Sequence, residues 1–282
     1  MKYTIGNEKL QIEADSLGAE LVSVRFAGKE RVWQNENGSW AGHAPVLFPV
    51  CGHFGVTVGG IRYPIRAHGF AKRSEFELNG AGGDFLSFRL VSSPETKRVY
   101  PYDFELTVRY TLRGNELITE YEVKNSGKTP LYFACGGHPS FALGGSVEGY
   151  AVEFSEEERF LNRVHNDDGY LTGEVQDLGT GKTLSLKEEY FANEYTLIFA
   201  DTRSKFVALK SPRGETVATL AFGGFSNLLL WKPQGAEMIC IEPWTNLPDL
   251  AGAEDSEFSK KAGVTEVAVG KRATFAFTIA YF

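Results

Sequence analysis

Cysteine is scarce in this chain, and the few cysteines exclude a disulfide framework. The 282 residues contain three, Cys51, Cys135 and Cys240, whereas small disulfide-stabilised secreted proteins carry larger, even numbers. The segment from Met1 to Ile5 alternates polar and apolar side chains and has no apolar signal-peptide core. Together these features predict a cytoplasmic protein with reduced thiols.

Long apolar runs and excess positive charge are also missing. No stretch approaches the roughly 18 consecutive apolar residues of a membrane-spanning helix. The formal net charge is -7, from 29 Lys and Arg against 36 Asp and Glu, so the surface as a whole should repel nucleic acid and anionic membranes. We therefore expect neither a nucleic acid nor a membrane as a partner.

The motifs of several large enzyme classes are absent. There is no Gly-x-Ser-x-Gly elbow of a serine hydrolase and no Gly-x-Gly-x-x-Gly that opens a helix. Gly181-Lys182-Thr183 imitates the end of a phosphate-binding loop, but Gln176 occupies the position of its first glycine. The sequence thus lacks the signatures of these reaction classes.

Period-2 alternation with intervening turn residues recurs along the whole chain and predicts short antiparallel strands. The clearest hairpin joins residues 104–110 to residues 117–123 through Arg113-Gly114-Asn115. The pattern weakens between residues 155 and 195, where a capping box at residues 155–158 and the stretch 186–193 predict short helical turns. No linker, repeat or shift in composition divides the chain, so we expect a single domain over residues 1–282, an all-β fold built as a large antiparallel β-sandwich. Exposed edge strands could pair across a dimer, so we expect either a monomer or a homodimer.

Two histidines and one glutamate stand at strand ends that glycine or proline interrupts. His138 lies between Gly136-Gly137 and Pro139, and His68 directly precedes Gly69. Glu242 ends an apolar run, where partial desolvation raises a carboxylate's pKa and strengthens it as a base. This combination predicts acid/base chemistry assembled by folding.

The remaining histidines and the cysteines favour ordinary structural roles. His43, His53 and His165 lack such a setting, so we interpret them as structural. Cys51-Gly52-His53 and Cys135-Gly136-Gly137-His138 contain thiols and imidazoles that zinc prefers, but their spacing matches no standard zinc module. We predict no metal site.

Five segments in the same order resemble the aldose 1-epimerase family, and in particular its LacX-like bacterial branch. They are Pro45-Val46-Leu47-Phe48-Pro49, His68-Gly69-Phe70, Gly137-His138-Pro139-Ser140-Phe141, Leu230-Trp231 and Cys240-Ile241-Glu242-Pro243-Trp244. The resemblance implies a galactose mutarotase-like supersandwich that holds a sugar in a cleft. It also implies that His138 is the general acid, Glu242 the general base, and His68 a second imidazole near the ring oxygen. The chemistry that the resemblance implies requires no cofactor.

The expected substrate-binding residues are Trp231, Arg66, Lys72 and Phe48. Trp231 or Trp244 beside the carboxylate could stack on a sugar ring. The family's sugar-binding aspartate corresponds only loosely to Asn193 or Glu194. Arg62, Arg66, Lys72 and Arg73 surround His68 in sequence, so a hexose 6-phosphate 1-epimerase is one alternative. A non-catalytic sugar-binding or sensing protein on the same fold is another.

Overall fold

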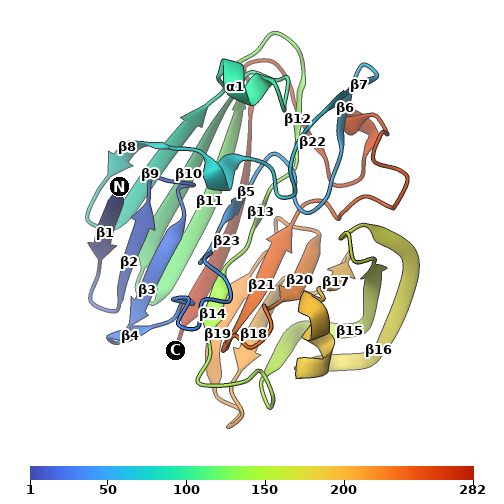
Figure 1. Cartoon of the computed structure of the whole chain (residues 1–282). Coiled ribbons are helices and arrows are strands. Elements are labelled where there is room, and N and C mark those ends of the chain that lie inside the picture. The colour runs from blue at the N-terminus through green and yellow to red at the C-terminus, as the bar shows by residue number, and fades with distance from the viewer.

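The computed structural model describes residues 1–282 as a β-rich molecule with only short helical segments (Figure 1). The smaller main sheet has the strand order β1-β2-β3-β4. Its strands are β1 (Lys2–Gly6), β2 (Leu10–Asp15), β3 (Leu21–Phe26) and β4 (Lys29–Glu30). Tyr3 of β1 packs edge-on against Phe88, with 5.7 Å between the ring centroids, so this sheet contributes to a shared core with the larger one.

The larger sheet has 15 strands. Its main path runs β5-β13-β21-β20-β17-β15-β18-β19-β23-β11-β10-β9-β8, with β14 paired to β21 and β16 paired to β15. The strands are β5 (Val46–Leu47), β8 (Glu77–Ala81), β9 (Phe85–Val91), β10 (Phe104–Arg113), β11 (Glu116–Asn125), β13 (Gly136–Gly137), β14 (Ser140–Ala142), β15 (Ala151–His165), β16 (Leu171–Ser185), β17 (Leu197–Ala200), β18 (Phe206–Lys210), β19 (Thr216–Ala221), β20 (Asn227–Trp231), β21 (Met238–Trp244) and β23 (Arg272–Tyr281).

The remaining elements are short. Two small sheets pair β6 (Val56–Val58) with β7 (Ile61–Tyr63) and β12 (Leu131–Phe133) with β22 (Thr265–Val267). The helical segments are α1 (Pro94–Lys97) and the 3-10 turns η1 (Ala71–Arg73), η2 (Glu188–Glu194) and η3 (Phe258–Lys260). None of these helices has the length and apolar character needed to cross a membrane.

The predicted large antiparallel β-sandwich is confirmed, including its clearest hairpin, β10–β11. The helical turn expected over residues 186–193 corresponds to η2. The helix expected at residues 155–158 is wrong, because these residues lie inside β15. Val152, Phe154 and Phe160 are buried, and the acidic run between them is accommodated by a register shift against β16 between Glu153 and Glu158.

Alternation along β21 separates a core face from a second face that carries polar groups. Ile239 and Ile241 belong to the main hydrophobic core, whereas Cys240, Glu242 and Trp244 point the other way. On the core side the two halves of the long sheet pack together. Gly137 lies so near Phe277 of β23 that a Cβ atom would be 2.7 Å from its ring.

Candidate active site

Strand register places His138 opposite Glu242. On either side of this position, β13 pairs Gly136 with Trp244, and β14 pairs Ser140 with Cys240. The same register therefore aligns the imidazole and the carboxylate on neighbouring strands and on one face of the sheet. His138 and Pro139 lie in the short break between β13 (Gly136–Gly137) and β14 (Ser140–Ala142), as the glycines and the proline in the sequence suggested.

Two apolar residues extend this row across the sheet. Leu229 of β20 pairs with Glu242, and Ile198 of β17 pairs with Leu229. Because directly paired residues share a face, the His138–Glu242 pair lies at the end of an apolar row on the sheet. This apolar row leaves little water around the carboxylate.

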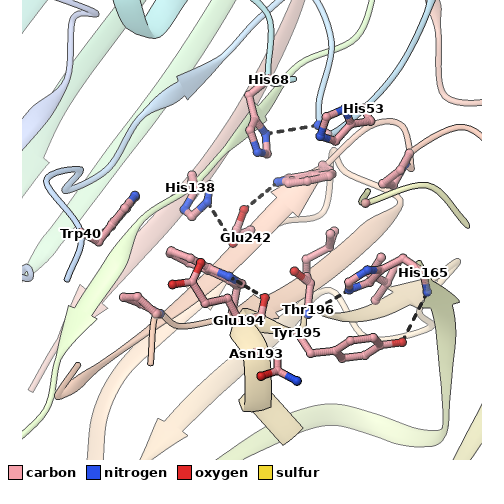
Figure 2. Close-up of a pocket in the computed structure, with 18 of the residues that line it drawn as sticks. Trp40, His53, His68, His138, His165, Asn193, Glu194, Tyr195, Thr196 and Glu242 are labelled. Atoms are coloured by element: carbon pink, nitrogen blue, oxygen red, sulfur yellow. Dashed lines mark hydrogen bonds and ion pairs between the residues drawn. The ribbon is translucent and has the colours of Figure 1, made fainter. Parts of the chain in front are cut away.

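The pair is close and deeply buried. His138 Nε2 lies 3.4 Å from Glu242 Oε1, and the Trp244 indole donates a 3.1 Å hydrogen bond to Glu242 Oε2 (Figure 2). Desolvation raises the pKa of Glu242 well above its usual value, although Trp244 and Lys72 oppose this. Desolvation, reinforced by the charge of Lys72, lowers the pKa of His138 to about 3. Both effects favour the uncharged forms.

His68 lies above the pair on a tight turn. Its backbone has φ 62°, and the Gly52 backbone N–H donates to its Nδ1 at 3.2 Å. Nδ1 therefore accepts, which assigns the ring proton of the neutral imidazole to Nε2. The ring is 5.7 Å from the His138 ring between centroids. Desolvation first, and then the charge of Lys72, lower the pKa of His68 well below its usual value.

A cavity of about 720 Å³ opens over these residues. Aromatic rings form one wall: Trp40 stacks on His138 with 5.1 Å between ring centroids, and Trp231 meets both rings edge-on. The volume lies in the range that small-molecule sites usually occupy. Aromatic faces next to an acid/base pair are suited to the apolar face of a sugar ring.

Comparison with known proteins places this architecture in a family. The family model described as aldose 1-epimerase matches residues 1–265. The chain belongs to the aldose 1-epimerase family. The chromosomal protein LacX of Lactococcus lactis subsp. lactis is 32% identical over 268 residues, which cover 88% of each chain. The chain is therefore a member of a family of isomerases and resembles LacX, as its motifs indicated.

Solved structures and a second curated relative agree with this membership. A galactose mutarotase related enzyme from Lactobacillus acidophilus has a TM-score of 0.92 and 27% identity, covering 100% of this chain and 97% of its own. A galactose mutarotase-like protein from Lactobacillus casei has a TM-score of 0.92 and 28% identity, covering 100% of both chains. A putative glucose-6-phosphate 1-epimerase of Escherichia coli strain K12 is 27% identical over 174 residues, or 56% of this chain and 54% of its own.

Within this aldose 1-epimerase family member, the cavity brings together five of the seven site residues expected from the sequence. These are His68, Lys72, His138, Trp231 and Glu242. Phe48 does not reach the cavity, because its ring is fully buried and packs against the core rings of Phe70, Phe104 and Phe133. Arg66 is solvent-exposed and does not line the cavity either. Their expected contact with the sugar is not supported.

The basic cluster around His68 disperses in three dimensions. Arg62 is exposed and paired with Asp255, and Arg73 donates to the Gly69 carbonyl at 3.2 Å. Only Lys72 of this cluster lines the cavity. Sequence proximity therefore overstated the positive charge available to a phosphate.

The interpretation of His53 and His165 as purely structural missed their position, because both line the cavity. The His165 imidazole is nevertheless held by its neighbours: Nδ1 lies 2.8 Å from the Asn166 carbonyl, and Nε2 accepts from the Thr196 N–H at 3.1 Å. It also stacks on Tyr195 with 4.1 Å between centroids. No local sequence pattern indicated that His53 and His165 lie at the cavity. His43 lies outside the cavity, beside Glu20.

The sequence also missed Trp40, Asp167 and Asp168 as cavity residues. They lie in loops, where alternation carries no information about direction. Asn193 and Glu194, which the sequence placed loosely in a sugar-binding region, do line the cavity. The Glu194 carbonyl accepts a 3.0 Å hydrogen bond from the Trp231 indole and so connects η2 to the aromatic wall.

An ion pair fixes η2 to the sheet. Lys232, whose side chain is only 1% exposed, lies 2.6 Å from the Glu188 carboxylate at the start of η2. Burial alone would raise the pKa of Glu188, but hydrogen bonds from Lys232 and Ser146 hold it below its usual value. The pair therefore helps to position the cavity residues at the end of η2.

The cysteines and histidines that suggested zinc in the sequence do not gather as a set. The group of ligand-type side chains that the fold brings together is instead His138, Cys240 and Glu242. It contains only one of the four residues considered from sequence spacing. Cys51, Cys135 and Cys240 are all free and buried.

Proposed function

We propose that the protein is an aldose 1-epimerase that interconverts the α and β anomers of a hexose. The observation that carries this proposal is the buried His138–Glu242 pair, 3.4 Å apart beside a sugar-sized cavity. Ring opening and closing needs one group that donates a proton and one that accepts a proton. We also propose that residues 1–282 act as one domain, since the main core joins Leu10 to Tyr281.

The roles follow from one proton shared by the pair. Before a sugar binds, burial favours a protonated Glu242 and a neutral His138. A sugar hydroxyl that donates a hydrogen bond to the carboxylate favours its charged form, which moves the shared proton towards His138. Glu242 then takes the proton of the anomeric hydroxyl while His138 protonates the ring oxygen.

The open-chain sugar completes the reaction without further groups. The ring carbon–oxygen bond breaks as the anomeric hydroxyl becomes the aldehyde. Rotation about the bond next to the aldehyde presents its other face, and ring closure with the proton transfers reversed gives the other anomer. Each positioned proton transfer contributes roughly 10²–10⁴-fold to the rate.

His68 and the aromatic wall support this chemistry by positioning. Because His68 Nδ1 accepts the Gly52 N–H, the ring has Nε2–H to donate to the sugar's ring oxygen or a neighbouring hydroxyl. Trp231 and Trp40 offer ring faces or edges for stacking. Asn193 or Glu194 would bind the sugar hydroxyls, in the role of the family's sugar-binding aspartate.

The charge of the cavity favours an unphosphorylated hexose over a hexose 6-phosphate. The cavity is lined by the carboxylates of Asp167, Asp168 and Glu194. Lys72 is the single lysine or arginine among its lining residues. A phosphate dianion would meet repulsion from the acidic side chains, and the nearby arginines are directed elsewhere. A non-catalytic sensor would have no use for a desolvated acid/base pair.

The remaining assignments extend the same proposal. Three free cysteines fit a reducing compartment, so we propose a cytoplasmic location. The net charge of -7 argues against nucleic acid as a partner. The chain could be a monomer or a homodimer, because the exposed strand β16 pairs with no strand other than β15 and could pair with a second copy.

Polarimetry of freshly dissolved α-glucose, α-galactose and glucose 6-phosphate tests the proposal. The wild type should accelerate anomerisation of a free hexose more than that of the phosphate ester. Glu242→Gln and His138→Gln should each lose roughly 10²–10⁴-fold, while His43→Gln, which removes an imidazole outside the cavity, should keep the rate. Unchanged turnover in both catalytic variants, with circular dichroism like that of the wild type, would refute the proposal.

A further inference from the structure

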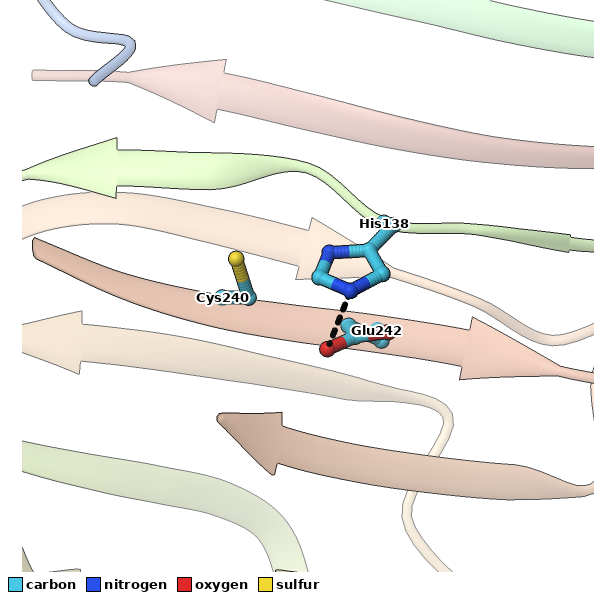
Figure 3. Close-up of side chains that lie close together, drawn as sticks. All are labelled: His138, Cys240 and Glu242. Atoms are coloured by element: carbon cyan, nitrogen blue, oxygen red, sulfur yellow. Dashed lines mark ion pairs between the residues drawn. The ribbon is translucent and has the colours of Figure 1, made fainter. Parts of the chain in front are cut away.

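Cys240 lies beside the acid/base pair, although the proposed epimerisation makes no use of a thiol. Figure 3 shows its sulfur beside the His138 ring, which lies above the Glu242 carboxylate. One ligand atom from each of these residues lies within 4.8 Å of the other two. Two residues apart on one strand, Cys240 and Glu242 necessarily share a face.

We propose that His138, Cys240 and Glu242 form an inhibitory binding site for a zinc ion. A thiolate, an imidazole and a carboxylate are the side-chain ligands that zinc accepts, and three protein ligands leave a fourth position for water. The cavity beside His138 and Glu242 supplies that open position. The inhibitory consequence rests on the proposed function, whereas the binding of the metal does not.

The geometry requires little rearrangement. Tetrahedral zinc with bonds of about 2.0–2.3 Å holds its ligand atoms roughly 3.3–3.8 Å apart. The 3.4 Å separation of His138 Nε2 from Glu242 Oε1 already meets this requirement. The Cys240 Sγ separations, which are within 4.8 Å, need to shorten by at most about 1 Å, which a side-chain adjustment can supply.

The surroundings of the three side chains place no lysine or arginine in an ion pair with Glu242. Cys240 packs with Trp33 and Met238 beneath the partly buried Trp40 and Trp231. Glu242 is only 1% exposed. A divalent cation would compensate its desolvated carboxylate, and the thiolate favours zinc over magnesium or calcium.

Zinc binding and catalysis would exclude each other. The ion would replace the Cys240 thiol proton and the proton shared by His138 and Glu242, so up to two protons would leave for solvent. The lone pairs that accept protons during epimerisation would then be bound to the metal. No oxidation or reduction is involved.

Direct metal binding tests the site without any reference to turnover. Tag-free wild type, Cys240→Ser and Cys135→Ser would be titrated with zinc in competition with a coloured chelator, and with cobalt(II) followed by absorption. Cys135→Ser is the matched control, because Cys135 is also free and buried but is not part of the cluster. The wild type and the control should bind one zinc per chain and show a thiolate-to-cobalt charge-transfer band.

Cys240→Ser should lose this band and bind zinc at least about 10-fold more weakly, since changes outside the ligand shell already cost that much. A band that persists in Cys240→Ser, or a wild type that binds no zinc, would overturn the site. In polarimetry, each protein's epimerisation rate with zinc is compared with its own zinc-free rate. This ratio should fall further for the wild type and Cys135→Ser than for Cys240→Ser. Zinc binding through Cys240 in a protein without epimerase activity would support the site and refute only the proposed function.

Discussion

Gly69, which follows His68, should tolerate no side chain. The loss in free energy of unfolding in Gly69→Ala measures how much the close packing of this turn contributes to stability. The backbone of Gly69 has φ 69°, and a Cβ atom would lie 2.1 Å from the Phe48 carbonyl oxygen. That oxygen accepts hydrogen bonds from the N–H groups of Phe70 at 3.0 Å and Ala71 at 3.2 Å. Relief of the clash therefore has to move the carbonyl that anchors the His68 turn.

The expected loss follows from these contacts. A left-handed alanine costs about 1–2 kcal/mol, and weakening two backbone hydrogen bonds costs about 0.5–1.5 kcal/mol each. The lower entropy of the unfolded alanine chain returns about 0.4–1 kcal/mol. The free energy of unfolding should thus fall by about 1–5 kcal/mol, with a central value of about 3 kcal/mol.

Gly28→Ala separates the clash from the backbone strain. Gly28 has φ 77°, but a Cβ atom there would meet nothing within 4 Å. Its variant should lose only about 1 kcal/mol. Urea unfolding followed by tryptophan fluorescence measures both values, and polarimetry measures the displacement of His68 as a lower rate for Gly69→Ala alone. Equal losses of stability in the two variants would refute the reasoning.

Three further predictions concern the core, the support of η2 and the aromatic wall. Phe88 is fully buried, so Phe88→Ala should lower the free energy of urea unfolding by about 3–5 kcal/mol; a loss below 1 kcal/mol would contradict close packing there. Glu188→Gln leaves buried Lys232 without its counter-charge and should cost about 1–2 kcal/mol, discounted because Glu188 is 42% exposed. Because the pKa of Glu188 is depressed below 4.5, that difference should be fully present above pH 4.5 and disappear as the pH falls through the lower folded value; a constant difference in urea titrations across this range would argue against the ion pair. Trp40→Ala removes the ring stacked on His138 and should raise KM about 10-fold, roughly 1.4 kcal/mol of lost sugar contact, so an unchanged KM in polarimetric kinetics would exclude Trp40 from the binding wall.

Local patterns singled out His68, His138 and Glu242, which the fold brings to one cavity, because their settings are unusual at short range. Glu242 ends an apolar strand, and glycine or proline interrupts the chain beside His68 and His138. The same reasoning failed for the acidic run 155–158, where buried Phe154 and Phe160 on either side determine a strand. Helix-capping chemistry is weaker than the burial of large apolar side chains.

Loop residues show the limit of such patterns most clearly. Asp167, Asp168 and Trp40 reach the cavity only because their loops fold over the sheet. Arg62 and Lys72 are close in sequence, yet one pairs with Asp255 at the surface and the other enters the cavity. Charge counted along the chain is therefore a poor guide to charge inside a site.

The sequence alone determined the strand alternation and the chemistry of the individual groups, because side-chain direction in a strand repeats every two residues. It could not determine that Glu242 lies opposite His138 on a neighbouring strand. These positions depend on the register of β13, β14 and β21, which packing of the whole sheet decides. The long-range pairing also creates the desolvation that shifts the pKa values of the pair, and no stretch of the chain contains that information by itself.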